Sequence, residues 1–74
     1  MKTKDLIEVD PEKMGGIPVF FGTRVPIQNL FDCLEIGESL DQFLEQFPTV
    51  ERAQAQAAIN LLGKKLTEEY EIAA

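Results

Sequence analysis

Residues 15–26 read GGIPVFFGTRVP, and this stretch marks the change from extended chain to helices. Paired glycines, two prolines and Gly22 punctuate it, which is typical of turns. Its apolar centre, residues 17–21, has the composition of a β-strand. Thr23 and Arg24 are its only polar residues, so we ask whether they bind a ligand or hold a bend.

A second segment of β-type composition, residues 6–9, precedes this stretch. The turn-forming sequence DPEKMGG lies between the two segments, so we expect them to pair as a small hairpin. Pro18 has no backbone N–H to donate to a strand ladder. The second strand should therefore lie at an edge or begin after that residue.

The first helix is predicted over residues 26–36. Pro26 suits the first helical position, because its φ is fixed and its missing N–H has no intrahelical partner there. Gly37 supplies a left-handed stop. The apolar residues between them recur with the spacing of one helical face: Ile27, Leu30, Phe31 and Leu34.

A second, short helix is predicted over residues 40–46. Ser39 followed by Gln42 is a capping-box pattern, and Pro48 ends the helix. Thr49 is then placed to cap a third helix over residues 50–66. Residues 67–74 are left as a C-terminal tail.

The third helix carries apolar or small residues on two sides. At 100° per residue, one side is the expected core stripe, formed by Val50, Ala53, Ala57 and Leu61. The opposite side holds Ala55, Ile59, Gly63 and Leu66. Two such sides usually meet two neighbours, which are either the C-terminal segment folding back or a second protein chain.

These elements predict a single α+β domain over residues 1–74, mainly α. Residues 1–25 hold the hairpin and a junction formed by Gly22, Thr23, Arg24 and Pro26. The three helices follow as a homeodomain-like helix-turn-helix. A chain of 74 residues has a thin core, so help from a partner or a second copy is expected.

The composition excludes several functions. The chain has no histidine and one cysteine, Cys33, so histidine-based catalysis and multi-cysteine metal sites are absent, and we expect no enzyme activity, metal or cofactor. Cys33 is interpreted as a packing residue. The apolar runs are too short for a membrane span, and the N-terminus lacks the apolar segment of a secretory signal, so the cytoplasm is expected.

Charge is divided unevenly along the chain, which carries −6 in total. Residues 26–74 hold nine acids against three bases, whereas acids and bases balance over residues 1–25. So acidic a helical half argues against broad affinity for nucleic acid. Specific contact remains open, because the helix that enters the major groove would present side chains able to bind bases or phosphates. The candidates are Thr49, Arg52, Gln56, Asn60, Lys64 and Lys65.

Residues 14–62 resemble the DUF433 family, whose pattern G-x-P-x-x-x-G-T-R-x-P is matched from Gly16 to Pro26. Gly37 and Pro48 also fall where the family's helices end. The resemblance implies a small antitoxin-like helix-turn-helix domain, a VapB-type partner of a PIN-like nuclease toxin that also binds its own operator DNA. In the first half of the last helix Arg52 is the only cation, a departure that favours toxin binding over DNA binding.

The sequence thus predicts a non-enzymatic regulator, homodimeric through the hairpin or through the third helix. The alternative is an acidic adaptor or homodimerisation module with no nucleic-acid role. Protein contact is expected at Ile59, Leu62, Leu66 and Tyr70. Arg24 is expected to bind backbone carbonyls, or a carboxylate such as Asp10 or Asp32, and so to hold the junction.

Overall fold

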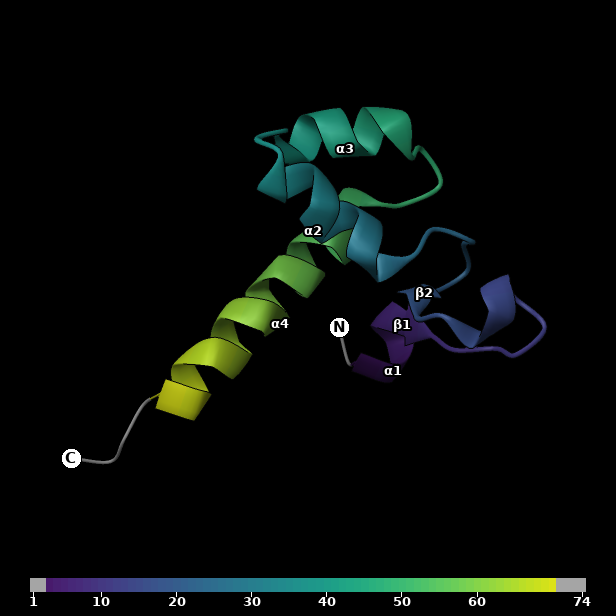
Figure 1. The fold of residues 1–74 in the computed structure, drawn as a ribbon, viewed down its shortest axis with the longest axis horizontal. Coiled ribbons are helices and arrows are strands. Elements are labelled where there is room, and N and C mark those ends of the chain that lie inside the picture. Colours follow the sequence, from purple (N-terminus) through teal and green to yellow (C-terminus); the bar gives the residue numbers. More distant parts are fainter. Residues whose placement is uncertain (1–2, 71–74) are drawn as a thin grey trace.

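The computed structural model describes the backbone of residues 3–70 and the side chains of residues 5–69. It is an α+β structure, mainly α, in which a short two-stranded hairpin is followed by three helices (Figure 1). The predicted fold class is confirmed. In chain order the elements are α1 (Thr3–Leu6), β1 (Ile7–Glu8), η1 (Met14–Gly16), β2 (Val19–Phe20), α2 (Ile27–Glu35), α3 (Leu40–Gln46) and α4 (Arg52–Tyr70).

The hairpin is shorter than predicted. β1 and β2 are antiparallel, with Ile7 opposite Phe20 and Glu8 opposite Val19. Leu6 belongs to α1 and not to a strand, although its carbonyl still accepts a hydrogen bond from the N–H of Phe21 at 2.8 Å. β2 begins after Pro18, as the missing N–H of that proline requires.

A second reversal, which the sequence did not predict, follows β2. The chain turns so that residues 25–27 run back along residues 18–20. The N–H of Phe20 donates to the carbonyl of Val25 at 2.9 Å, and the N–H of Ile27 donates to the carbonyl of Pro18 at 3.1 Å. β2 is therefore paired on both sides, and the start of α2 is fixed directly against the hairpin.

Local signals set the ends of α2 and α3. Pro26 lies one residue before α2, with an extended ψ of 139°, so it caps the helix and is not its first residue as predicted. Gly37, at φ 91°, stops the helix as predicted. The capping box of Ser39 and Gln42 is present, and the bounds of α3 agree with the prediction.

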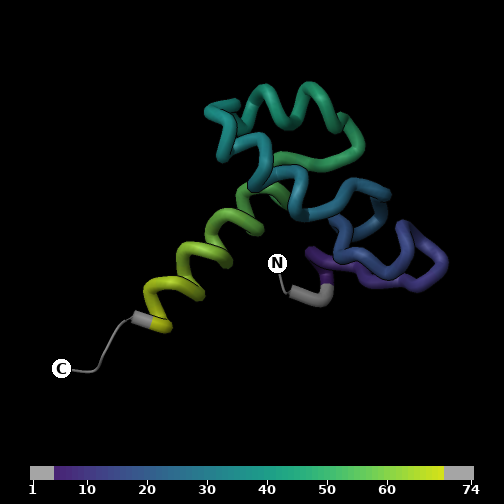
Figure 2. Tube along the Cα trace, viewed as in Figure 1, coloured from purple at the N-terminus to yellow at the C-terminus, as the bar shows by residue number. Residues whose placement is uncertain are grey.

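α4 begins two residues later than predicted and continues further, through residues 67–70 of the predicted tail. Residues 71–74 of that tail lie outside the described part. Thr49 does not cap the helix, because the side-chain carbonyl of Gln54 accepts a hydrogen bond from the N–H of Glu51 at 2.9 Å and closes the first turn instead. The second half of α4 extends away from the other elements (Figure 2). No helix within residues 3–70 combines the length and the hydropathy that crossing a bilayer needs.

The core lies where α1, β2, α2, α3 and the first turns of α4 meet. Its largest fully buried side chains are Phe20, Phe43, Leu6, Leu30 and Val19. The rings of Phe20 and Phe43 lie 6.1 Å apart between centroids, so they link the hairpin to α3.

The side of α4 that packs on this core overlaps the predicted stripe only in part. Ala55 and Ala58 are buried, whereas Ala53 and Leu61 are exposed. Alanines occur on every side of this helix, and such a small side chain is tolerated both inside and outside. The apolar pattern alone therefore located the core stripe of the third helix only in part: Val50 is buried and Ala57 packs against the core as predicted, whereas Ala53 and Leu61 do not.

We expect Phe43→Ala to lower the free energy of unfolding by about 3–5 kcal/mol, because it removes a fully buried ring and leaves a cavity. A loss of that size is a large fraction of the stability of so small a domain. Phe21→Ala is the matched control, since 53% of that side chain is exposed. Urea unfolding followed by circular dichroism measures both; equal losses would place Phe43 outside the stabilising core.

Candidate functional site

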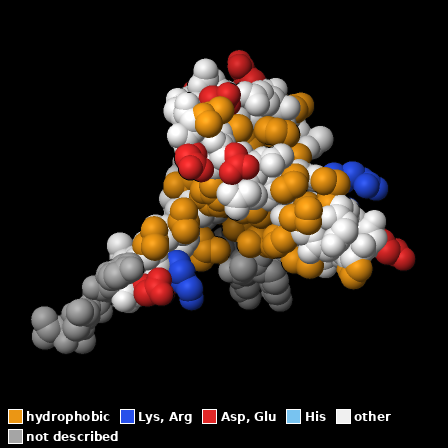
Figure 3. All heavy atoms as spheres, viewed as in Figure 1, with side chains coloured by type: hydrophobic (Ala, Val, Ile, Leu, Met, Phe, Trp, Pro, Cys, Tyr) orange, Lys and Arg blue, Asp and Glu red, His pale blue; other side chains and the backbone are white. Residues whose placement is uncertain are grey.

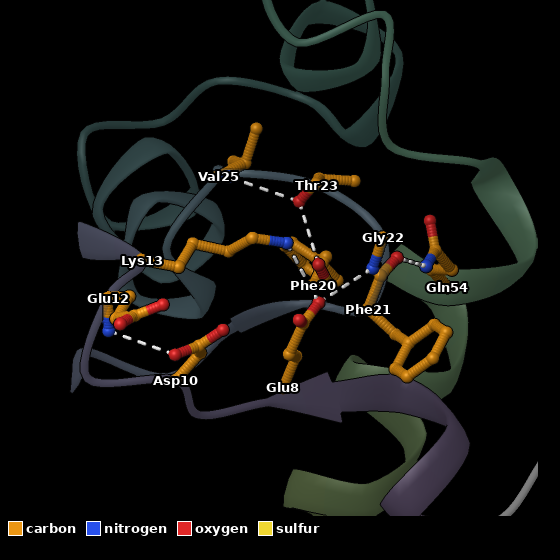
Figure 4. Close-up of polar contacts among 10 residues, drawn as sticks. All are labelled: Glu8, Asp10, Glu12, Lys13, Phe20, Phe21, Gly22, Thr23, Val25 and Gln54. Carbon is orange, nitrogen blue, oxygen red and sulfur yellow. Dashed lines mark hydrogen bonds and ion pairs between the residues drawn. The ribbon is translucent and has the colours of Figure 1, made fainter.

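Thr23 holds the bend between β2 and α2. Its hydroxyl donates to the carbonyl of Phe20 at 2.8 Å and accepts from the N–H of Val25 at 3.0 Å (Figure 4). The backbone N–H of Thr23 also donates to the Phe20 carbonyl, at 3.0 Å. The side chain is buried, so these polar groups have little water to replace their partners. Thr23 therefore determines the conformation of the loop.

Gly22 and Glu8 join this bend to the hairpin. Gly22 has φ 77°, a left-handed conformation that residues with a side chain adopt rarely. Its N–H donates to Oε1 of Glu8 at 3.1 Å, and Nζ of Lys13 lies 3.1 Å from the same oxygen. The Gly22 hydrogen bond and then Lys13 hold the pKa of Glu8 below its ordinary value.

Gln54 connects the bend to α4. Its side-chain amide donates to the carbonyl of Phe21 at 2.9 Å, while its side-chain oxygen caps α4 at Glu51. The residue is buried, although glutamine is usually exposed. The pattern of a glutamine three residues after a cap position was visible in the sequence, but it did not point to the partner in the loop.

Arg24 has no internal partner of the kind that the sequence predicts. It is exposed, and within residues 5–69 its guanidinium makes no hydrogen bond or ion pair. Asp10 instead accepts from the N–H of Glu12 at 2.9 Å, and Asp32 accepts from the side chain of Gln28 at 3.0 Å. Thr23, and not Arg24, therefore ties the junction together.

Arg24 borders an open depression beside the bend, which we call the notch. Its volume is about 510 Å³, and it is lined by Lys13, Gly22, Thr23, Arg24, Val25 and Thr49. None of these six described residues is acidic, in a chain that carries −6. Because Lys13 is paired with Glu8, Arg24 carries the uncompensated positive charge among these lining residues.

A second open depression, the apolar groove, lies where α1, β1 and α2 meet α4. Its volume is about 410 Å³, and its lining is Leu6, Ile7, Ile27, Phe31, Ala58, Leu61, Leu62 and Lys65. Leu62 is 44% exposed, and Leu66, one helical turn further on, is 49% exposed. Hydrophobic side chains follow the projecting part of α4 beside basic and acidic ones (Figure 3). Large apolar side chains thus continue along α4 past the point where the core ends.

Cys33 is buried against the core on α2. Burial raises the pKa of its thiol, and the nearby charge of Glu38 raises it further. The thiolate is therefore disfavoured at neutral pH, and a packing role agrees with the burial.

A family model described as "Protein of unknown function (DUF433)" matches residues 7–60. This chain belongs to the DUF433 family. The match runs from β1 to the middle of α4, so it contains the bend and the notch but ends before Leu62 and Leu66.

Two other comparisons find similar proteins. The "Uncharacterized protein y4eO" of Sinorhizobium fredii is 29% identical over 55 residues, which cover 74% of this chain. Those residues are 25% of that protein, so the chain spans about a quarter of the length of this relative. The crystal structure of a DUF433 member from Anabaena variabilis superposes with a TM-score of 0.69 at 22% identity, covering 96% of this chain and 71% of that one. This likeness shows a shared fold.

The DUF433 fold spreads the predicted DNA-contacting residues over α4 and the turn before it. Arg52 forms an ion pair with Asp41 of α3. Gln56 donates to the side-chain oxygen of Asn60 at 3.0 Å. Thr49 lies at the notch, and Lys64 and Lys65 are exposed on the projecting half of α4. The most favoured base-contacting candidates thus already have partners within the chain, and DNA contact stays a prediction.

The predicted protein-contacting residues lie closer together. Leu62 and Leu66 are exposed on the projecting half of α4, and Ile59 is half-buried against the core. The side chain of Tyr70 lies outside the described residues. Leu61, which the sequence assigned to the core, is 38% exposed and lines the apolar groove.

Thr23→Val keeps the shape of the side chain and removes both hydrogen bonds of the hydroxyl. We expect it to lower the free energy of unfolding by about 1–3 kcal/mol, because the buried polar groups lose partners. Thr23→Ser keeps the hydroxyl and is expected to cost less. Thermal unfolding of the three proteins measures this, and a serine variant no more stable than the valine variant would contradict it.

Glu8 predicts a stability that depends on pH. Its pKa is lower in the folded chain than the ordinary 4.5, so the unfolded chain binds the proton more tightly. The stabilisation is present above the unfolded pKa and is lost as pH falls through the folded value. Unfolding midpoints of wild type and Glu8→Gln should therefore differ at neutral pH and converge well below pH 4.5. If the difference between the two unfolding midpoints stayed constant over that pH range, the ionised Glu8 carboxylate would not be the stabilising group.

Proposed function

We propose that this chain is a non-enzymatic, antitoxin-like protein-binding module, whose partner is a PIN-like nuclease toxin. The observation that supports this is the second half of α4, which leaves the body of the domain carrying exposed Leu62 and Leu66. The described part of the chain makes few packing contacts with this half of α4 and so stabilises it little. A partner that covers these leucines makes the extended helix useful.

The apolar groove extends the same surface. Leu61 and Leu62 belong both to its lining and to the exposed helix, so a partner lying along α4 reaches the groove without a break. An amphipathic helix seated in an apolar groove is a common mode of protein recognition. Lys65 borders the groove and supplies a polar rim.

The charge of the chain supports a basic partner. A nuclease that handles an anionic substrate presents a positive surface, and a protein of charge −6 is attracted to it over a long range. This attraction speeds association, whereas the leucines supply the buried area. Binding should therefore weaken, but not vanish, as salt is added.

Operator binding is a weaker part of the proposal. Arg52 is engaged by Asp41, and further acids lie on α2 and α3, which pack beside the start of α4. A gel shift with the DNA upstream of the gene, at low and at near-physiological salt, tests it. Specific retardation that persists at the higher salt would add DNA binding, and none at either salt would leave protein binding alone.

The double variant Leu62→Gln, Leu66→Gln tests the protein-binding surface. Both side chains are exposed and glutamine favours helix, so the fold should be kept while affinity for the nuclease falls about tenfold or more. Ile36→Gln is the matched control, because Ile36 is 73% exposed at the end of α2, away from this surface. Tagged proteins are used to capture the nuclease from the native cell, and the captured nuclease is assayed with and without each variant.

Three results would contradict the proposal. One is the absence of any nuclease among the captured proteins. Another is equal capture by the wild type and by the double variant. The third is a self-associating chain whose second copy, seen by light scattering, occupies the leucines and leaves no nuclease bound; this result favours the homodimerisation module.

A further inference from the structure

We propose that the notch is a carboxylate-binding site, in which Arg24 pairs with an Asp or Glu side chain of a partner protein. The first support is the rigidity of the backbone that carries Arg24. Thr23 and Val25, on either side of it, are fixed by the hydrogen bonds of the Thr23 hydroxyl. The backbone of so constrained a loop has little freedom left to lose when Arg24 binds a ligand, which favours affinity.

The second support is the absence of an internal acid for Arg24. The carboxylate of Glu8 lies against the bend, but it already accepts the Gly22 N–H and pairs with Lys13 Nζ. Figure 4 shows the Glu8 carboxylate beneath these two donors. Arg24 is thus an exposed guanidinium beside a depression whose other cation, Lys13, is already paired with Glu8.

The third support is the chemistry of the lining. A guanidinium presents paired N–H donors in a plane, and these match the two oxygens of a carboxylate. Thr49, an exposed residue that also lines the notch, offers a hydroxyl to the same ligand. The half-buried Val25 forms an apolar wall of the notch. Such a wall can contact the CH₂ groups of an Asp or Glu side chain, which a free hydrated ion lacks.

A protein carboxylate is favoured over a nucleic-acid phosphate by the surrounding charge. A polyanion that reaches Arg24 also brings many further phosphates toward a chain of charge −6. A single acidic side chain on a basic partner carries no such penalty. The notch lies beside the turn that precedes α4, and the leucines lie on the second half of that helix, so the two surfaces are separate contacts.

The proposed function enters this inference only in making the ligand part of a partner protein. The test uses no partner, so it can fail while the leucine surface stands, and the reverse also holds. A ¹⁵N-labelled chain is titrated at fixed ionic strength with the blocked peptide acetyl-Gly-Asp-Gly-amide. The matched probe is acetyl-Gly-Asn-Gly-amide, which has the same shape without the charge.

We expect the Asp peptide to shift the side-chain Nε–H signal of Arg24 and the amide of Thr49 in a saturable way, and the Asn peptide to shift neither. Arg52, already paired with Asp41, is the internal control in the same spectra. Arg24→Gln should weaken peptide binding about tenfold, and Arg24→Lys should weaken it less, since lysine keeps the charge and loses the planar fork. Both substitutions are at an exposed position, so the chain should remain folded.

The inference is overturned by any of three outcomes. The Arg24 and Arg52 signals respond alike, the Asn peptide binds as well as the Asp peptide, or Arg24→Gln leaves the shifts of Thr49 unchanged. A parallel titration with a short DNA duplex provides one further outcome. A duplex that saturates the Arg24 signal at lower concentration than the Asp peptide makes the notch a phosphate site and also overturns it.

Discussion

The two hydrogen bonds of the Thr23 hydroxyl are the constraint on which the arrangement of this domain depends. They close the bend that returns the chain along β2, and this return places Pro26 and Ile27 so that α2 begins against the hairpin. Gln54 reaches the same bend from α4. One short loop therefore positions both α2 and α4, although these helices lie far apart in the sequence. A small core with few large side chains is then enough to complete the fold.

The thin core explains why α4 has two different halves. Its first turns bury Ala55 and Ala58 against the rest of the domain, but among the described residues no further helix or strand covers Leu62 and Leu66. Helices of this length gain most of their stability from packing and not from propensity. The exposed half of α4 is thus the least supported part of the described structure, and a bound partner would stabilise it while burying its apolar side.

Signals that act within a few residues could be predicted from the sequence, and those that act at a distance could not. The capping box of α3 and the stop at Gly37 were right because each depends on its own neighbours. The packed side predicted for the third helix was right at Val50 and Ala57 and wrong at Ala53 and Leu61, because alanine gives little contrast between core and surface. The role given to Arg24 belongs to Thr23, since a sequence shows which groups can donate hydrogen bonds but not which of them the fold buries.

The separate roles of Thr23 and Arg24 also bear on the function proposed for this DUF433 member. A threonine that satisfies the bend internally leaves the next residue, Arg24, no structural duty among the described residues, so its charge is available to a ligand. In a chain of charge −6, whose excess of acids lies in residues 26–74, an uncompensated cation at Arg24 is a local point of attraction for an anion. The leucines of α4 offer apolar surface that can be buried but no specific polar contact. Arg24 offers a specific polar contact but little surface to bury. If the proposed partner is bound, specific recognition draws on both, because apolar burial alone discriminates poorly between surfaces of similar shape.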